Sequence, residues 1–139
     1  MLVRDANILM RAVLGKHARE LLAKYGQRIE FVAPDVAFDE ARRHLPKVLE
    51  RRRLQGEPFM AFFDSLANVV RTVEFEVYSG FEAIARERLA RRDEDDWPIL
   101  AAALALRCPI WTEDTDFFGC GVATWTSDRV EMYLSEVAP

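Results

Sequence analysis

The sequence contains little cysteine and histidine, with two residues of each among 139. Cys108 and Cys120 do not form a Cys-x-x-Cys pair and have no pair of histidines nearby, which argues against a zinc-binding pattern. This usage predicts two free thiols in a reducing compartment. His17 and His44 are interpreted as ordinary helix residues. No constellation of histidine, cysteine or serine therefore competes for the role of catalytic nucleophile.

Long hydrophobic runs are also absent. The apolar segments are far shorter than the roughly 20 residues that a membrane-spanning helix needs, and the opening Met-Leu-Val-Arg-Asp has no signal-peptide pattern. No repeat, low-complexity segment or linker divides the chain. With half of the residues hydrophobic and 30% charged, we expect a single domain over residues 1–139 and a cytoplasmic location.

An excess of positive charge is missing too. The formal net charge of −4 provides no global attraction to nucleic acid, so any such binding must use a local basic patch. The run Arg51-Arg52-Arg53 is one candidate. It is interpreted either as a solvated helix face or as a surface that meets phosphates.

What the sequence does contain is a dense acidic stretch, residues 93–118. An acidic run opens an apolar helix, a short apolar strand follows, and further acids stand at the end of that strand. Asp95 or Asp96 can cap the helix. Folding gains little by gathering like charges in this way, so we expect a divalent cation to hold them together.

Short apolar strands alternate with helices along the whole chain. Strands are predicted at residues 1–5, 29–33, near 72–75, 109–112 and 121–126. Helices are predicted at residues 7–25, after an Asp35 N-cap, at 58–70, 81–89 and 96–107, and from a Ser127 N-cap towards Leu134, with a turn or short helix at 114–118. The alternation predicts an α/β fold with a parallel sheet, in which sites form beyond the carboxyl ends of the strands.

Four acids flank the predicted strands at this edge. Asp5 ends the first strand and Asp114 lies just beyond the strand at 109–112. Asp96 opens the helix before that strand, and Glu40 lies on the helix after the second strand. If the first and fourth strands are neighbours, all four carboxylates converge. Hard divalent cations prefer such oxygen ligands, so the pattern predicts a site for Mg²⁺ or Mn²⁺.

These acid motifs resemble, in order and spacing, those of the PIN-domain nucleases. The four matching segments are Asp5-Ala-Asn-Ile-Leu, Pro34 through Glu40, Asp93 through Ala103 with Asp96 in the ligand position, and Thr112-Glu-Asp-Thr-Asp-Phe with Asp114 and Asp116. The resemblance covers almost the whole chain. It implies a three-layer α/β/α fold whose parallel sheet has about five strands in the order 3-2-1-4-5.

The resemblance also implies function. It implies metal-dependent cleavage of RNA phosphodiester bonds by Mg²⁺ or Mn²⁺, and many small members of the family are toxins of type II toxin–antitoxin pairs. We therefore expect an endoribonuclease with RNA as substrate and an antitoxin protein as a candidate partner. A homodimer and the number of metal ions, one or two, are left open.

Two other functions remain in view. A Mg²⁺-dependent phosphohydrolase would need a nucleophilic aspartate followed two residues later by a second acid, and Asn7 stands at that position. A non-catalytic nucleic-acid or protein-binding module of the PIN fold would not need to keep all four acids.

Within this reading each site residue has an expected role. Asp5, Glu40, Asp96 and Asp114 are expected to be the ligands and the catalytic acids. Three further residues have two readings each: Asp116 is a fifth ligand or a cap of the following turn, Asn7 supports Asp5 or merely opens a helix, and Thr112 binds a ligand carboxylate or simply favours a strand. Glu113 is expected to alternate away from the site.

Overall fold

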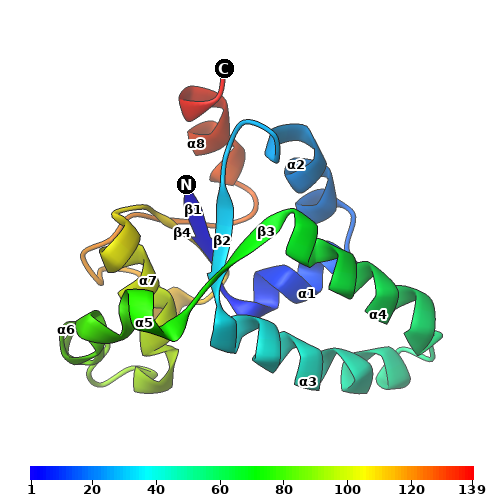
Figure 1. Cartoon of the computed structure of the whole chain (residues 1–139), viewed down its shortest axis with the longest axis horizontal. Coiled ribbons are helices and arrows are strands. Elements are labelled where there is room, and N and C mark those ends of the chain that lie inside the picture. The colour runs from blue at the N-terminus through cyan, green and yellow to red at the C-terminus, as the bar shows by residue number, and fades with distance from the viewer.

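The computed structural model describes all residues, 1–139. At its centre lies a parallel sheet (Figure 1). Its strands are β1 (Leu2–Arg4), β2 (Phe31–Pro34), β3 (Val70–Val73), β4 (Ile110–Trp111) and β5 (Thr124–Trp125). The spatial order β3-β2-β1-β4-β5 confirms the predicted order 3-2-1-4-5.

Helices cover both faces of the sheet. They are α1 (Ala6–Leu14), α2 (His17–Tyr25), α3 (Asp35–Arg51), α4 (Gly56–Ser65), α5 (Phe75–Tyr78), α6 (Glu82–Arg88), α7 (Trp97–Leu106) and α8 (Val130–Val137), with 3-10 turns η1 (Leu66–Asn68), η2 (Ser79–Phe81), η3 (Glu94–Asp96) and η4 (Thr115–Phe117). Figure 1 shows α1 to α4 on one side of the strands and α5 to α7 on the other. Because both faces are covered, the central strands are buried throughout. Strand β2 is apolar along its whole length, whereas β1 ends with the buried Arg4.

Helix α7 is apolar all round because it is enclosed by protein. Its first seven residues, 97–103, are all buried, and it packs against β1, β2 and β4 as well as α5 and α6. Pro98 lies in the first turn, where its missing N–H costs nothing. The helix ends at Arg107, which adopts a left-handed φ of 54°. This buried helix fixes the position of Asp96, the residue before it. None of the helices is both long and apolar enough to cross a bilayer.

The predicted continuous helix over residues 7–25 is wrong, because the chain breaks at Gly15. Gly15 is extended (φ −112°, ψ 169°), and its N–H donates to the carbonyl oxygen of Arg11 at 2.7 Å. A Cβ at this position would lie 3.0 Å from the same oxygen, so glycine permits the close turn. The break redirects α2 towards α8, where Lys24 and Tyr25 both donate to Glu131.

Two predicted helix caps are also wrong, because the side chains have other partners. Helix α3 has Pro34 at its N-cap, and Asp35 instead accepts hydrogen bonds from the N–H of Val36 and the hydroxyl of Tyr78. Helix α8 starts three residues after Ser127 and has Arg129 at its N-cap. The freed Ser127 hydroxyl accepts the indole N–H of Trp111 at 3.0 Å.

The boundary between the fourth helix and the third strand also differs from the prediction. The helix expected over residues 58–70 ends at Ser65, and residues 66–68 tighten into a 3-10 turn. The strand expected near 72–75 therefore begins at Val70, which pairs with Phe31 of β2. Helix α3 contains Pro46 and continues to Arg51.

Candidate metal centre

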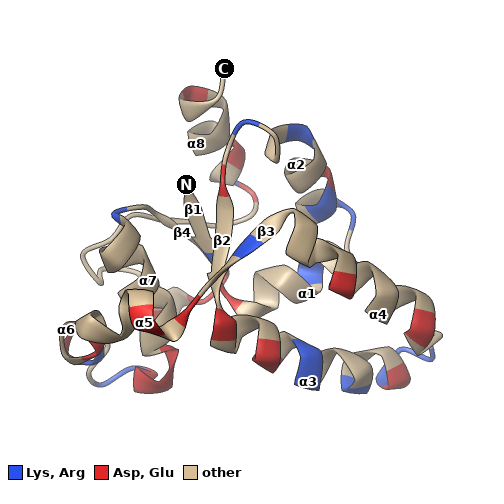
Figure 2. Cartoon of the chain, viewed as in Figure 1, with Lys and Arg blue, Asp and Glu red and all other residues tan.

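The predicted acids lie at the carboxyl edge of the sheet. Strands β1 and β4 are hydrogen-bonded neighbours, with Arg4 paired to Trp111. Asp5 follows the first of these strands directly, and Asp114 follows the second after a two-residue connection. Figure 2 shows acidic segments around this end of the sheet, at the start of α3 and beside α5 and α7. The parallel topology thus places acids from distant segments at the carboxyl edge of the sheet.

Asp5 is buried and held by two hydrogen bonds. It is the N-cap of α1, where Oδ1 accepts from the N–H of Ile8 at 2.9 Å, and Oδ2 accepts from the hydroxyl of Thr112. The Thr112 hydroxyl in turn accepts from the N–H of Asp114 at 2.9 Å. Burial raises the pKa of Asp5 to about 6, although both hydrogen bonds act to lower it. Two predicted site residues are therefore linked through Thr112.

Three carboxylates gather beside this pair. One oxygen each of Asp96, Asp114 and Asp116 lies within 4.8 Å of the others. Asp114 is the N-cap of η4 and accepts from the N–H of Asp116 at 2.9 Å. Asp96 occupies the N-cap position of α7, but its side chain makes no capping hydrogen bond; Asp93 caps the preceding η3 by accepting from the N–H of Asp95 at 3.0 Å.

The electrostatics of the cluster are unfavourable without a counterion. The pKa of Asp96 is raised to about 7, chiefly by burial and then by the charges of Asp93 and Asp114. Carboxylate oxygens that lie within 4.8 Å of one another can contact one Mg²⁺ ion together, because its oxygen ligands stand at 2.0–2.1 Å and opposite ligands are therefore about 4.2 Å apart. The purely carboxylate donor set and its spacing fit a hard divalent cation.

The remaining predicted site residues lie around this cluster. Glu40 is exposed and does not belong to the group of three, although its charge contributes to the raised pKa of Asp5. Asn7 is exposed near the start of α1 and lines a cavity of about 490 Å³. Glu113 lines the same cavity and accepts from the N–H of Ser127 at 2.6 Å, so its carboxylate is engaged away from the three gathered acids.

Sequence reasoning assigned no site role to two neighbouring residues. Asp93 is not among the acids singled out from the sequence, yet its charge helps to raise the pKa of Asp96. Arg92 had no assigned role, yet its guanidinium binds backbone carbonyls in the turn that holds Asp116. The one signal in the sequence is the basic pair Arg91-Arg92 standing directly before the acidic run.

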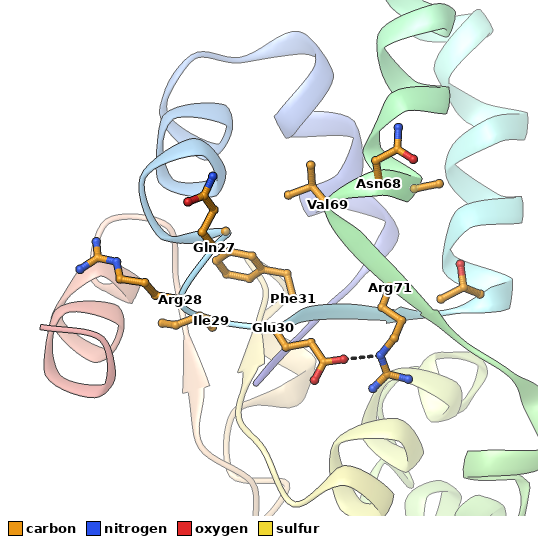
Figure 3. Close-up of a pocket in the computed structure, with 11 residues that line it drawn as sticks. Gln27, Arg28, Ile29, Glu30, Phe31, Asn68, Val69 and Arg71 are labelled. Atoms are coloured by element: carbon orange, nitrogen blue, oxygen red, sulfur yellow. Dashed lines mark hydrogen bonds and ion pairs between the residues drawn. The ribbon is translucent and has the colours of Figure 1, made fainter.

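A separate pocket lies at the opposite end of the strands. Its volume is about 430 Å³, and it is formed by the segments that lead into β2 and β3 (Figure 3). Glu30 and Arg71 form an ion pair at this pocket. Because β1 and β2 run parallel, the pocket opens at the amino ends of the strands, remote from the gathered acids. The acid cluster is therefore the candidate site.

Comparisons with known proteins agree with this arrangement. A family model described as a PIN domain matches residues 3–135. The fold is similar to that in the crystal structure of VapBC2 from Rickettsia felis bound to a DNA fragment from its promoter, with a TM-score of 0.72, 13% identity, and coverage of 90% of this chain and 97% of that chain.

Two further solved structures are similar. A chain of a toxin–antitoxin complex from Klebsiella pneumoniae gives a TM-score of 0.65 at 19% identity, covering 91% of this chain and 98% of that one. The protein PAE2754 from Pyrobaculum aerophilum gives a TM-score of 0.70 at 15% identity, covering 98% and 88%. A comparison with curated proteins gives no match. At these identities the structural likenesses establish the fold.

Proposed function

The chain belongs to the PIN-domain family, and we propose that it is a metal-dependent endoribonuclease whose acidic site takes Mg²⁺ or Mn²⁺. The observation that carries the proposal is the gathering of carboxylate oxygens from Asp96, Asp114 and Asp116 within 4.8 Å. Asp5 and Glu40 act on the same edge through their charges. Such a cluster opposes its own assembly unless a cation binds it.

Each acid has a role that follows from its surroundings. Asp96, Asp114 and Asp116 would hold the cation, which when bound stabilises charge on the phosphoryl oxygens and lowers the pKa of a water molecule. Asp5 is fixed by two hydrogen bonds and orients the Asp114 backbone through Thr112. Glu40 is exposed, so it is available to orient the attacking water or to accept its proton.

The cavity beside Asn7 supports a nucleic-acid backbone as the substrate. It is lined by Arg11 and Arg52, both exposed and neither in an ion pair with a carboxylate. Free guanidinium groups beside an acidic site offer contacts for the phosphates that flank the scissile bond. We propose single-stranded or looped RNA, because an exposed backbone enters an acidic edge more easily than a paired stem does.

The biological context proposed is a toxin of a type II toxin–antitoxin pair. Two of the similar structures are described as VapBC2 and as a toxin–antitoxin complex. This chain covers 97% and 98% of the matched chains. An antitoxin would be a second, separate protein that covers the acidic edge and blocks it.

The test is cleavage of a mixed RNA pool by purified, partner-free protein. We expect cleavage with Mn²⁺ or Mg²⁺, none with EDTA, and poor recovery with Ca²⁺, whose looser coordination geometry positions water less well. Asp96→Asn should abolish cleavage. Asp95→Asn is the matched control, because the exposed Asp95 side chain makes no hydrogen bond and contributes only its backbone N–H. Cleavage that persists in EDTA or in Asp96→Asn would reject the proposal.

A further inference from the structure

Arg92 joins the two acid-bearing segments of the site. Its Nη1 donates to the carbonyl oxygen of Asp116 at 2.7 Å and to that of Phe118, and it lies 3.5 Å from the carbonyl oxygen of Thr115. These carbonyls belong to η4 and to the residue that follows it. The guanidinium of Arg92, which lies in the connection between α6 and η3, therefore binds the turn that carries two of the three gathered acids.

The backbone on both sides of this contact is constrained. Arg91 adopts a left-handed φ of 69°, and the N–H of Arg92 donates to the carbonyl of Leu89 at 2.9 Å, which fixes where the guanidinium starts. On the other side, Gly119 has a φ of 82°, a conformation that suits glycine, and turns the chain directly after Phe118. The contact thus joins two segments whose local geometry is already set.

Repulsion between the acids makes this contact important for the geometry of the site. Asp96 and Asp114 come from segments separated by α7 and β4, and a carboxylate oxygen of one lies within 4.8 Å of a carboxylate oxygen of the other, so their like charges repel. Repulsion of this kind tends to move the η4 turn away from the start of α7. Hydrogen bonds from a guanidinium to the last carbonyls of a helical turn are charge-assisted and oppose that movement.

We infer that Arg92 is a positioning residue, whose guanidinium holds the η4 turn so that Asp114 and Asp116 stay within reach of Asp96 and together receive a divalent cation. The inference rests on the proposed function in assigning that cation to these acids. Arg92 itself contacts no site carboxylate: its partners are the backbone carbonyls.

An electrostatic role and a positioning role of Arg92 predict opposite changes in cation affinity. A guanidinium near the acids repels an incoming cation, so removing its charge alone would tighten cation binding. Removing its hydrogen bonds to the η4 turn would weaken cation binding, because the ligands would no longer be held together. The sign of the change in Mn²⁺ affinity therefore separates a positioning role from a purely electrostatic one.

Calorimetric titration with Mn²⁺ measures that sign. We expect Arg92→Met to raise the Kd about 10- to 100-fold, the usual effect of losing a group that orients metal ligands. Arg92→Lys should recover part of the affinity, because a single ammonium can still reach one carbonyl. Arg91→Met is the matched control, because it removes the same charge at the neighbouring residue, whose exposed side chain makes no hydrogen bond. It removes charge without removing a contact, so it should leave the Kd unchanged or slightly lower. Unchanged or tighter binding by Arg92→Met overturns the inference.

Hydrogen exchange in EDTA tests the same role without metal. The N–H of Asp116 donates to Asp114 Oδ1 at 2.9 Å and that of Phe118 to the carbonyl of Thr115 at 3.0 Å. We expect these amides to exchange at least about tenfold faster in Arg92→Met, whereas the amides of β1 and β2 keep their protection. Equal exchange of the turn in wild type and variant overturns the inference.

The outcomes separate this inference from the proposed function, because neither measurement uses RNA. If Mn²⁺ binds and Arg92→Met weakens it, the inference stands even where no RNA is cleaved. If the wild type binds no Mn²⁺, the metal assignment fails and the exchange experiment decides the role of Arg92. Thermal melting in EDTA first verifies that the variants fold. If Arg92→Met does not fold, both measurements are made on Arg92→Lys instead.

Discussion

Arg4 supplies the most demanding test of the fold, because it is a cation buried without a hydrogen-bond partner. The side chain is fully buried in β1, and all three of its guanidinium nitrogens lack an acceptor. Its Cζ lies 4.1 Å from the ring centroid of Phe31 and 4.6 Å from that of Trp111, on the two neighbouring strands. Burial lowers the pKa of this group well below its ordinary value.

The balance of these terms gives the expected size of the effect. Each buried donor left without a partner costs about 1–3 kcal/mol, so three nitrogens cost about 3–9 kcal/mol. Two desolvated cation–π contacts return about 2 kcal/mol each, or about 4 kcal/mol in all. Burial of the guanidinium therefore reduces the free energy of unfolding by a net amount of up to about 5 kcal/mol. Methionine keeps the unbranched apolar stem and removes the charge, so we expect Arg4→Met to stabilise the protein by about 1–4 kcal/mol.

Urea unfolding at neutral pH in EDTA measures the change. Arg4→Lys is the control, because it keeps a charge but loses the planar face that stacks between the rings, and a lysine ammonium is more strongly hydrated. We expect the order of stability to be Arg4→Met, then wild type, then Arg4→Lys. A loss of more than about 1 kcal/mol in Arg4→Met would refute the reasoning and would show that the guanidinium gains more from its aromatic neighbours than it loses by burial.

Two further predictions concern the site. The pKa of Asp96 is raised in the folded protein to about 7, so its contribution to stability is complete below the unfolded pKa of about 4 and is lost as the pH rises through 7. In EDTA the melting temperature of the wild type should therefore fall between pH 5 and pH 8 by more than that of Asp96→Asn, and parallel pH profiles would contradict the assigned cause. For RNA binding, replacing Arg11 and Arg52 together with methionine should reduce the slope of log affinity against log salt by about 1.4, since each contact with a single strand contributes about 0.7. The control pair Arg51 and Arg53 lies outside the cavity and should leave the slope unchanged, and an equal effect of both pairs would remove the cavity from the RNA path.

The parallel sheet was predictable from the sequence because the strand and helix patterns that indicate it are short and local. Strand β2 is apolar throughout and β1 begins with the apolar Leu2 and Val3, and each strand is followed by a helix with an apolar stripe. Once the strands are parallel and β1 neighbours β4, Asp5 and Asp114 must stand at the same edge. The family resemblance added the strand order, and the structure confirms it.

The features that the sequence did not reveal depend on partners far away in the chain. Ser127 has the composition of an N-cap, but the indole of Trp111 occupies its hydroxyl. Asp35 likewise serves the hydroxyl of Tyr78. Gly15 is itself a local signal for a chain break, but the direction that α2 then takes involves its contacts with α8 far along the chain. Local propensity limits the conformations and hydrogen bonds that a residue favours, and tertiary contacts determine which of them occur in the fold.

The acid site shows why its supporting residues were the hardest to predict. Carboxylates that repel one another carry a cost that the rest of the fold must offset. Asp5 is held by the N–H of Ile8 and the hydroxyl of Thr112, and the η4 turn is held by Arg92. Arg92 and the N–H of Ile8 act through backbone atoms, so their residue types carry no mark of a site. Thr112 differs, because binding a ligand carboxylate is one of its two expected roles, and its hydroxyl donates to Asp5. The role of Arg92 becomes recognisable only when the geometry shows which turn it holds in place.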